Sequence, residues 1–234
     1  MTERAREVGS PIDGDRSLQT NVGKVPLHEY RLRLAGREWG ILHTDALLSY
    51  ADEVAFLHAE KDRLPYGVAL WPSALALAHD VASRAGELRG ARVLELGAGT
   101  GLPGIVAAAL GARVTQTDRH ELAMAVCRRN GERNGVETLD HRIADWTSWD
   151  DAMRYDWIIG SDILYGETLH PHLRRIFEGN LAPRGRVLLA DPFRAASLRM
   201  LEGMEAEGWE VLVSTWSVGE EGESRSVGTF ELTP

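Results

Sequence analysis

The sequence predicts an α/β protein with a doubly wound, mostly parallel sheet of seven strands and an antiparallel hairpin at its C-terminal edge. Three observations support this. Beyond residue 89, short apolar runs typical of buried strands alternate with amphipathic segments of helical length. Gly and Pro mark the junctions between these segments. The last two strand-like segments have no helix between them, which indicates an antiparallel pair.

The N-terminal part of the chain precedes this alternating pattern. Residues 1–25 are polar and charged and lack the apolar run of a signal peptide, so we expect a flexible arm. Residues 28–44 alternate in polarity on both sides of Ala35 and Gly36, which predicts a β-hairpin.

Two helices are predicted after the hairpin. One covers residues 47–61, and the other begins near residue 73, directly after Pro72, and ends at Gly86. We expect residues 26–88 to pack on the sheet and residues 89–234 to form the core of one compact domain.

The elements of the core follow from hydrophobic periodicity. Continuous apolar runs predict buried strands, and apolar residues three and four apart predict the helices that connect them. Strands are predicted over 91–96, 112–118, 139–146, 155–165, 185–192, 209–218 and 224–233, and helices over 101–111, 120–135, 168–181 and 195–208.

Charge and cysteine content limit the classes of function. The 26 basic and 35 acidic residues give a formal net charge of −9, which argues against a nucleic-acid-binding protein and fits a cationic substrate. Cys127 is the single cysteine, so no internal disulfide forms and a reducing compartment, the cytoplasm, is expected. No apolar run approaches the ~20 residues of a membrane span. His170 and His172 lack a further ligand at metal-binding spacing, so no metal is expected.

Acidic residues follow five successive strands of the predicted sheet. Because ligands bind at the carboxyl ends of parallel strands, these positions are candidates for a binding site. Any one of them could instead cap a helix or start a turn. A row of carboxylates would favour a cationic or hydroxyl-rich ligand over a phosphate-rich one. The five residues are Glu95, Asp118, Asp145, Asp162 and Asp191.

The turn after the first core strand is rich in glycine. Gly97, Gly99 and Gly101 let the backbone approach a ligand between strand and helix. Gly99, Gly101 and Gly104 also match the G-x-G-x-x-G fingerprint of dinucleotide-binding proteins, which is a weak signal by itself. Glu95, two residues before the first glycine, and the helix-less terminal strands favour a different cofactor.

These residues resemble a known family. The match to class I, seven-β-strand S-adenosylmethionine-dependent methyltransferases, which have a Rossmann-like fold, is carried by VLELGAGTGLPGIVAAALGA at 93–112 and VTQTD at 114–118. Three further motifs resemble the protein-lysine methyltransferases of methyltransferase family 16: LWPSALALA before the loop, ADW after the third strand and SDILY, a D-x-x-Y motif, after the fourth. The resemblance covers roughly residues 64–193 and implies S-adenosylmethionine as the cofactor.

The resemblance also implies roles for particular residues. The glycine loop would pack against the methionine part of the cofactor, and Glu95 would hold that loop or meet the amino group. Asp118 would accept hydrogen bonds from both ribose hydroxyls, and Asp145 from the adenine amino group. Trp146 would contact adenine and Trp71 the methionine end, although either indole could simply be a packing anchor. The full expected cofactor site is Trp71, Glu95, Gly97, Ala98, Gly99, Gly101, Asp118, Asp145, Trp146 and Ser161.

The D-x-x-Y motif supplies the expected catalytic residues, Asp162 and Tyr165. A lysine ammonium has no lone pair, so it must lose its proton before it can attack a methyl group. Asp162 would attract and orient the amine, and Tyr165 would be a hydrogen-bond partner that closes the channel. The alternative is that Asp162 caps the following helix and Tyr165 packs against it.

We therefore expect an N-methyltransferase that modifies a lysine side chain of a protein. One rival is a small-molecule N-methyltransferase of the same fold, whose site should be enclosed. A second is an NAD-dependent oxidoreductase, which would need a general acid such as Tyr-x-x-x-Lys, and the sequence contains none. A third is a non-catalytic protein that binds the cofactor structurally. The sequence does not identify the methyl acceptor, the number of methyl groups or the oligomeric state.

Overall fold

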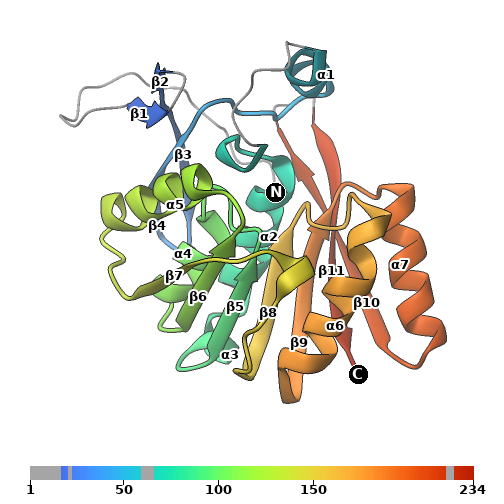
Figure 1. Cartoon of the computed structure of the whole chain (residues 1–234). Coiled ribbons are helices and arrows are strands. Elements are labelled where there is room, and N and C mark those ends of the chain that lie inside the picture. The colour runs from blue at the N-terminus through green and yellow to red at the C-terminus, as the bar shows by residue number, and fades with distance from the viewer. Residues whose placement is uncertain (1–16, 21–22, 59–65, 220–223) are drawn as a thin grey trace.

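The computed structural model describes residues 17–20, 23–58, 66–219 and 224–234, and it has the predicted architecture (Figure 1). Its seven-stranded sheet consists of β5 (Arg92–Leu96), β6 (Arg113–Asp118), β7 (Leu139–Ile143), β8 (Tyr155–Ser161), β9 (Leu181–Asp191), β10 (Glu210–Val218) and β11 (Arg225–Thr233).

The order of the strands places a topological switch point at β5. The order is β10-β11-β9-β8-β5-β6-β7, so the chain builds outward from β5 first on one side and then on the other. β5 to β9 are parallel, whereas β11 pairs antiparallel with both β9 and β10. The predicted antiparallel C-terminal edge is therefore confirmed. The carboxyl ends of β5, β6 and β8 meet where such sheets bind ligands.

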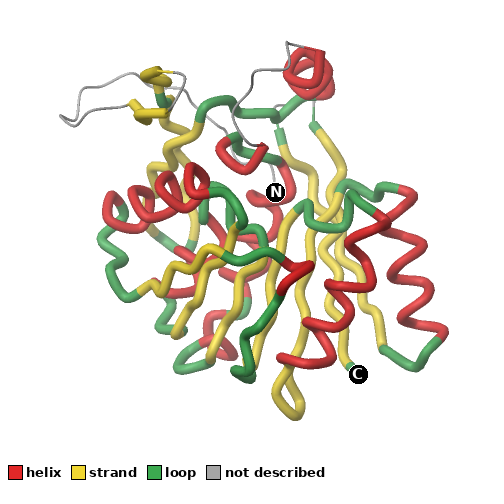
Figure 2. Tube along the Cα trace, viewed as in Figure 1, coloured by secondary structure: helices red, strands yellow, loops and turns green. Residues whose placement is uncertain are grey.

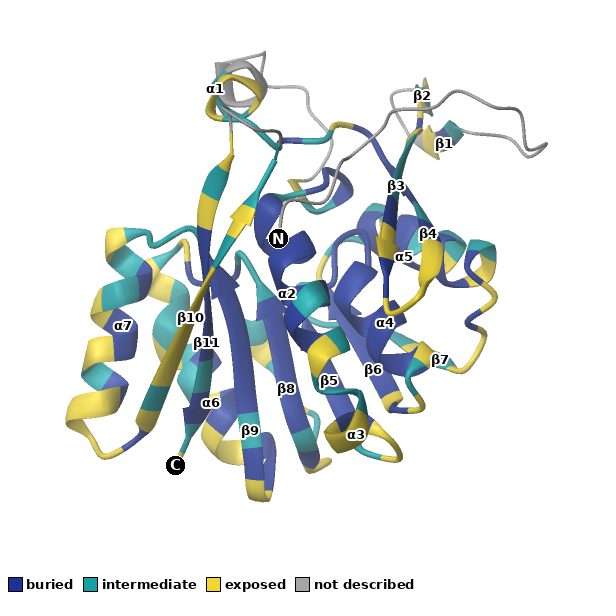
Figure 3. Ribbon diagram, turned by 180° about the vertical axis from the view of Figure 1, so that it is seen from behind, coloured by how far each residue is buried: buried dark blue, intermediate teal, exposed yellow. Residues whose placement is uncertain are grey.

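Helices cover both faces of this sheet, which makes it doubly wound (Figure 2). Alternate residues of each strand face opposite sides, so Val93 belongs to one hydrophobic core and Leu94 to the other. Figure 3 shows that β5, β8 and β9 are almost wholly buried, whereas β10 is exposed at the sheet edge. The first core contains α2 (Pro72–Ser83) and α4 (Leu102–Ala109); the second contains α6 (His170–Asn180) and α7 (Ala195–Ala206).

The predicted N-terminal hairpin is also present. β3 (His28–Leu34) and β4 (Arg37–His43) are joined at Ala35 and Gly36, whose φ angles of 52° and 76° are those of a tight hairpin turn. β4 is fixed to α5 (Glu121–Arg133) by Asn130, which accepts from the Leu42 backbone nitrogen at 2.7 Å and donates to the Leu42 carbonyl oxygen at 3.0 Å.

The remaining elements are short. They are β1 (Ser17–Thr20), β2 (Gly23–Pro26), α1 (Tyr50–His58), α3 (Ala85–Leu88) and the 3₁₀ helices η1 (Tyr66–Val68), η2 (Trp146–Ser148) and η3 (Glu167–Leu169). Among the described residues, no helix is long and apolar enough to span a membrane.

Several expected bounds differ from the structure. The strands expected over 139–146 and 155–165 end earlier, at Ile143 and Ser161, and the strand expected from residue 185 begins at Leu181. The predicted arm over residues 1–25 includes β1 and part of β2, which pair antiparallel; residues 1–16 lie outside the described part. These strands are too short and polar to give a strand signal. The helix expected to end at Gly86 ends at Ser83 instead, and α3 follows after Arg84.

Candidate functional site

The loop that joins β5 to α4 requires glycine. Gly97, Gly99 and Gly101 have φ angles of 63°, 56° and 82°, in the left-handed region that side chains disfavour. Space is restricted as well, because a Cβ atom on Gly99 would lie 2.8 Å from the carbonyl oxygen of Gly67 in η1. The loop therefore lies at the carboxyl edge of the sheet with η1 packed against it; Gly97 is half-buried, whereas Gly99 and Gly101 are buried.

Glu95 lies beneath this loop. It is 1% exposed, and its Oε2 accepts a hydrogen bond of 2.6 Å from Gln116 Nε2. Gln116 also donates to the Gly101 carbonyl oxygen at 2.9 Å and accepts from the buried thiol of Cys127. Burial raises the pKa of Glu95 to about 7, although hydrogen bonds from Gln116 and the Gly104 backbone act in the opposite direction. Of the two roles expected for Glu95, this geometry fits that of holding the loop.

Asp118 ends β6 and faces the same loop. Its Oδ2 accepts from the Gly99 backbone nitrogen at 3.1 Å, and its Oδ1 from the His120 backbone nitrogen at 2.9 Å. A Cβ atom on Gly67 would lie 3.4 Å from Oδ2, so η1 also approaches this carboxylate. Because each carboxylate oxygen has two lone pairs, both can still accept from a ligand hydroxyl. The position suits the ribose-binding role expected for Asp118.

Asp145 and Trp146 follow β7. Asp145 is exposed and caps η2, where its Oδ1 accepts from the Thr147 backbone nitrogen at 2.8 Å and the Thr147 hydroxyl at 2.7 Å. These hydrogen bonds lower the pKa of Asp145. The Trp146 indole reaches the glycine loop, since a Cβ atom on Gly97 would lie 3.2 Å from its Cζ2. The structure thus brings Trp146 to the site through space, across β5 and β6.

Three further residues of the expected cofactor site lie around the loop. Ala98 is buried, and its backbone nitrogen donates to the Thr117 carbonyl oxygen at 2.9 Å, which ties the loop to β6. Trp71 precedes α2, and its Nε1 donates to the Tyr66 carbonyl oxygen at 3.1 Å. The rings of Trp71 and Tyr66 lie 6.4 Å apart. Ser161 is the last residue of β8 and is half-buried.

Asp162 is held at the end of β8 in an uncommon conformation. Its φ is 55°, and its backbone nitrogen donates to the Ala190 carbonyl oxygen at 2.9 Å. The side chain is 12% exposed, and Oδ1 accepts from the Arg194 guanidinium. Burial raises the pKa of Asp162, and Arg194 opposes that rise. The following residue, Ile163, is 3.0 Å from the position of a Gly97 Cβ, so Asp162 lies beside the glycine loop. It does not cap the next helix.

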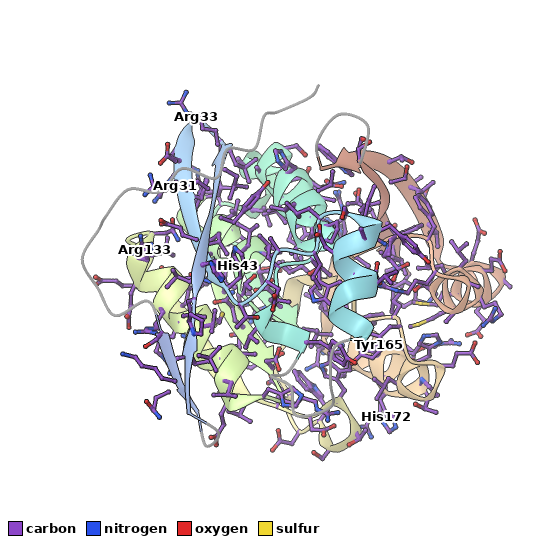
Figure 4. The ribbon with its side chains drawn as sticks, turned by 90° about the horizontal axis from the view of Figure 1, so that it is seen from above. Arg31, Arg33, His43, Arg133, Tyr165 and His172 are labelled. Carbon is purple, nitrogen blue, oxygen red and sulfur yellow. The ribbon has the colours of Figure 1, made fainter. Side chains whose placement is uncertain are left out.

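Tyr165 does not have the position expected from its spacing. Figure 4 shows it on the same face of the molecule as α1, and it is 59% exposed. Ile163 and Leu164 fill the buried positions between the two motif residues. Within the described residues, no hydrogen bond joins Tyr165 to Asp162. Tyr165 is therefore exposed at the surface and does not hold the Asp162 carboxylate in this structure.

The five acids predicted at the carboxyl edge require a correction. All five lie in or just after the parallel strands, but Glu95 and Asp191 are 1% and 0% exposed. They point into the layers between sheet and helices, where the protein itself satisfies them. Of the other three, Asp145 is exposed, Asp118 is 7% exposed and the Asp162 side chain is 12% exposed, so these three lie nearer to solvent than Glu95 and Asp191.

Sequence reasoning missed three contributors to the site. Gly67 brings η1 against the glycine loop, and Gln116 links that loop to Glu95. Arg194 contacts Asp162 from the start of α7. A basic residue three positions after the strand-end Asp191 was the available signal for Arg194, whereas nothing in the local sequence marks Gly67 or Gln116.

Known proteins resemble this chain in sequence. A family model described as lysine methyltransferase matches residues 52–201. Protein N-lysine methyltransferase METTL21A of Xenopus tropicalis is 39% identical over 145 residues, which cover 59% of this chain and 67% of the relative. Histone-arginine methyltransferase METTL23 of Xenopus laevis is 38% identical over 106 residues, which cover 43% of this chain and 45% of the relative.

The fold is also found among solved structures. The glycopeptide N-methyltransferase MtfA, complexed with sinefungin, superposes with a TM-score of 0.56 at 16% sequence identity, covering 67% of this chain and 92% of that chain. At this identity the likeness concerns the fold alone.

Proposed function

Since this chain belongs to the lysine methyltransferase family, we propose that it transfers a methyl group from S-adenosylmethionine to the side-chain amine of a lysine in a protein. The chain is an S-adenosylmethionine-dependent methyltransferase. The relative METTL21A, named a protein N-lysine methyltransferase, supports lysine as the acceptor. We also propose a cytoplasmic location for the chain, because its one cysteine can form no internal disulfide, which favours a reducing compartment.

The residues around the glycine loop fit this cofactor. Gly97, the half-buried glycine of the loop, would let the methionine part approach closely, and Asp118 would accept from the ribose hydroxyls. Trp146, beside Gly97, would contact the adenine. When bound, S-adenosylmethionine supplies a methyl group on a positively charged sulfur, and transfer leaves the electron pair of the broken S–C bond on that sulfur.

One observation carries the proposal: a buried carboxylate, Asp162, stands beside the cofactor loop with one oxygen not hydrogen-bonded. An amine nucleophile must be neutral and aimed along the line of transfer. Asp162 Oδ2 would accept an N–H of that amine and orient its lone pair. Charge that develops on nitrogen would then be stabilised by the carboxylate.

Exposed aromatic residues favour a protein over a small-molecule acceptor. Tyr66 and Tyr165, on segments beside the loop and beside Asp162, are 62% and 59% exposed. Tyrosine is well suited to contact a polypeptide, because it offers a large apolar surface and a hydrogen-bonding tip. An enclosed site for a small amine would bury such side chains.

The proposal is tested with tritiated S-adenosylmethionine. The protein is incubated with a lysate from its own cell, and labelled bands are hydrolysed and analysed for methylated amino acids. We expect methyllysine with the wild type, none with Asp162→Asn, and wild-type labelling with Asp140→Asn, an exposed acid on β7. Methylarginine, or label confined to small molecules, would overturn the lysine assignment.

A further inference from the structure

Arg194 connects two acids that come from neighbouring strands. Its Nη1 contacts Asp162 Oδ1 and donates to Asp191 Oδ2 at 3.0 Å. Its backbone nitrogen donates to Asp191 Oδ1 at 2.7 Å, and the Ser197 hydroxyl donates to Oδ2 at 2.8 Å. Asp191 is fully buried, and these donors from its own chain satisfy both of its oxygens. It therefore anchors Arg194 and is not a ligand-binding acid.

The two oxygens of Asp162 are left in different states by this arrangement. Oδ1 is taken by Arg194, whereas Oδ2 is buried and has no hydrogen bond. The Ser73 hydroxyl of α2 lies near enough to lower the pKa of Asp162, yet its Oγ also lacks a hydrogen bond of normal geometry. Ser73 is thus a weak neutral donor beside Asp162, and among the described residues no donor makes a hydrogen bond of normal geometry to Oδ2, so a further donor to this buried acceptor would be stabilising.

We propose that Arg194 is a positioning residue that holds Oδ1 of Asp162 and so leaves Oδ2 as the acceptor for the substrate amine. The inference rests on the proposed function, in which Asp162 receives that amine. The backbone of Asp162 is fixed by its bond to Ala190, and Arg194 fixes the side chain. An N–H of the substrate then has a single acceptor, which sets the direction of the nitrogen lone pair.

The charge of Arg194 has a second effect on the reaction. Burial raises the pKa of Asp162 and the negative charge of Asp191 raises it further; Arg194 opposes both. An unpaired carboxylate would also favour the ammonium form of lysine, which cannot attack. Partial neutralisation by Arg194 weakens that preference while leaving an acceptor for the neutral amine. Arg194 and Asp191 are the charged groups that act on Asp162, and Ser73 adds a neutral hydroxyl.

The test uses Arg194→Gln and Arg194→Lys in the full chain. The control is Arg199→Gln, which removes an exposed guanidinium of α7 that pairs with Glu167. Two quantities are measured for each variant: the pH dependence of methyl transfer to lysate protein, and the titration of the Asp162 carboxyl by carbon NMR with isotope-labelled aspartate. The Asp162 resonance is assigned from Asp162→Asn, and calorimetry with S-adenosylmethionine verifies that the cofactor site is intact.

We expect Arg194→Gln to move the acidic limb of the rate profile to higher pH. At a fixed pH on the acidic limb, the rate of methyl transfer should fall about tenfold for each pH unit by which the limb moves. The Asp162 resonance should titrate at higher pH as well. Arg194→Lys should restore the pH profile and the Asp162 titration in part, and Arg199→Gln should match the wild type in both measurements. A wild-type profile and titration in Arg194→Gln would overturn the inference.

The NMR measurement separates this inference from the proposed function. If the wild type labels no lysine but the Asp162 titration still depends on residue 194, the lysine assignment fails and the control of Asp162 by Arg194 stands. If lysine is labelled but neither quantity depends on residue 194, the proposed function stands and the role of Arg194 is refuted.

Discussion

The clearest test of the polar layer beneath the glycine loop is Glu95→Gln, which keeps the shape of the side chain and removes its charge. Glu95 is buried, and its partners Gln116 and the Gly104 backbone are neutral donors. Within the described part of the chain no cation offsets the cost of burying this carboxylate, and the nearby charge of Asp118 adds to it, so its pKa rises from the usual 4.5 to about 7. Above that pH the folded protein carries a buried anion.

The size of the effect follows from the two pKa values. At about 1.4 kcal/mol for each pKa unit, a rise from 4.5 to about 7 corresponds to about 3 kcal/mol. Because the folded pKa is the higher one, the contribution of Glu95 to stability is complete below pH 4.5 and is lost as the pH rises through about 7. Glu95→Gln should therefore become more stable relative to the wild type by up to about 3 kcal/mol over that range.

Urea unfolding from about pH 5 to pH 8 measures this difference. The control is Glu202→Gln, which removes an exposed acid on α7. His43, whose pKa is lowered by burial to about 4, also titrates differently in the folded and unfolded states. Its contribution is the same in wild type and variant and cancels in their difference. A free-energy difference between Glu95→Gln and wild type that does not change with pH would refute the reasoning.

Three further results are expected. Asp118→Asn should weaken S-adenosylmethionine binding by about 1–3 kcal/mol in calorimetry, because a carboxylate acceptor is lost; unchanged affinity would contradict the ribose-binding role. Gly99→Ala should lower the free energy of unfolding by at least about 1–2 kcal/mol, since its φ is 56° and its Cβ would meet the Gly67 carbonyl oxygen at 2.8 Å. Gly203→Ala, a helical position with open space, should not destabilise the protein, and equal losses in both would refute this account. Tyr165→Phe should leave stability unchanged and raise KM for the protein substrate, and an unchanged KM would show that its hydroxyl is not used.

The sheet and its cofactor loop could be predicted because both follow from local sequence. Strand and helix signals depend on residues a few positions apart, and right-handed crossovers then bring the carboxyl ends of parallel strands to one edge. The need for glycine at positions 97, 99 and 101 is likewise local, because it reflects the φ angles of one turn. The same reasoning placed Asp118 and Asp162 at the carboxyl ends of two parallel strands, β6 and β8.

The contacts that determine the burial and hydrogen bonding of each acidic side chain could not be predicted in this way. Arg194 contacts Asp162 because Ser161 pairs with Ala190 in the β8–β9 register. The sequence of either strand alone does not determine that register. Asp191, the last residue of β9, is buried among donors from the start of α7, whereas Tyr165 lies exposed in the loop after β8, following two buried residues. A one-residue error in such assignments exchanges buried and exposed positions.

Burial acts in the same direction on Glu95 and Asp162, yet their partners give them different chemistry. Neutral donors leave Glu95 with a pKa near neutrality, so its charge depends on pH and its function is to support the loop. Asp162 has a guanidinium, which favours the anion that a substrate amine requires. Experiments should therefore distinguish the roles of the two acids. Glu95→Gln should change how stability depends on pH and leave the acidic limb of the rate profile in place, whereas Arg194→Gln should move that limb. If Glu95→Gln moved it, the group that limits turnover at low pH would be Glu95, beneath the loop, and Asp162 would not be the acid that governs the amine.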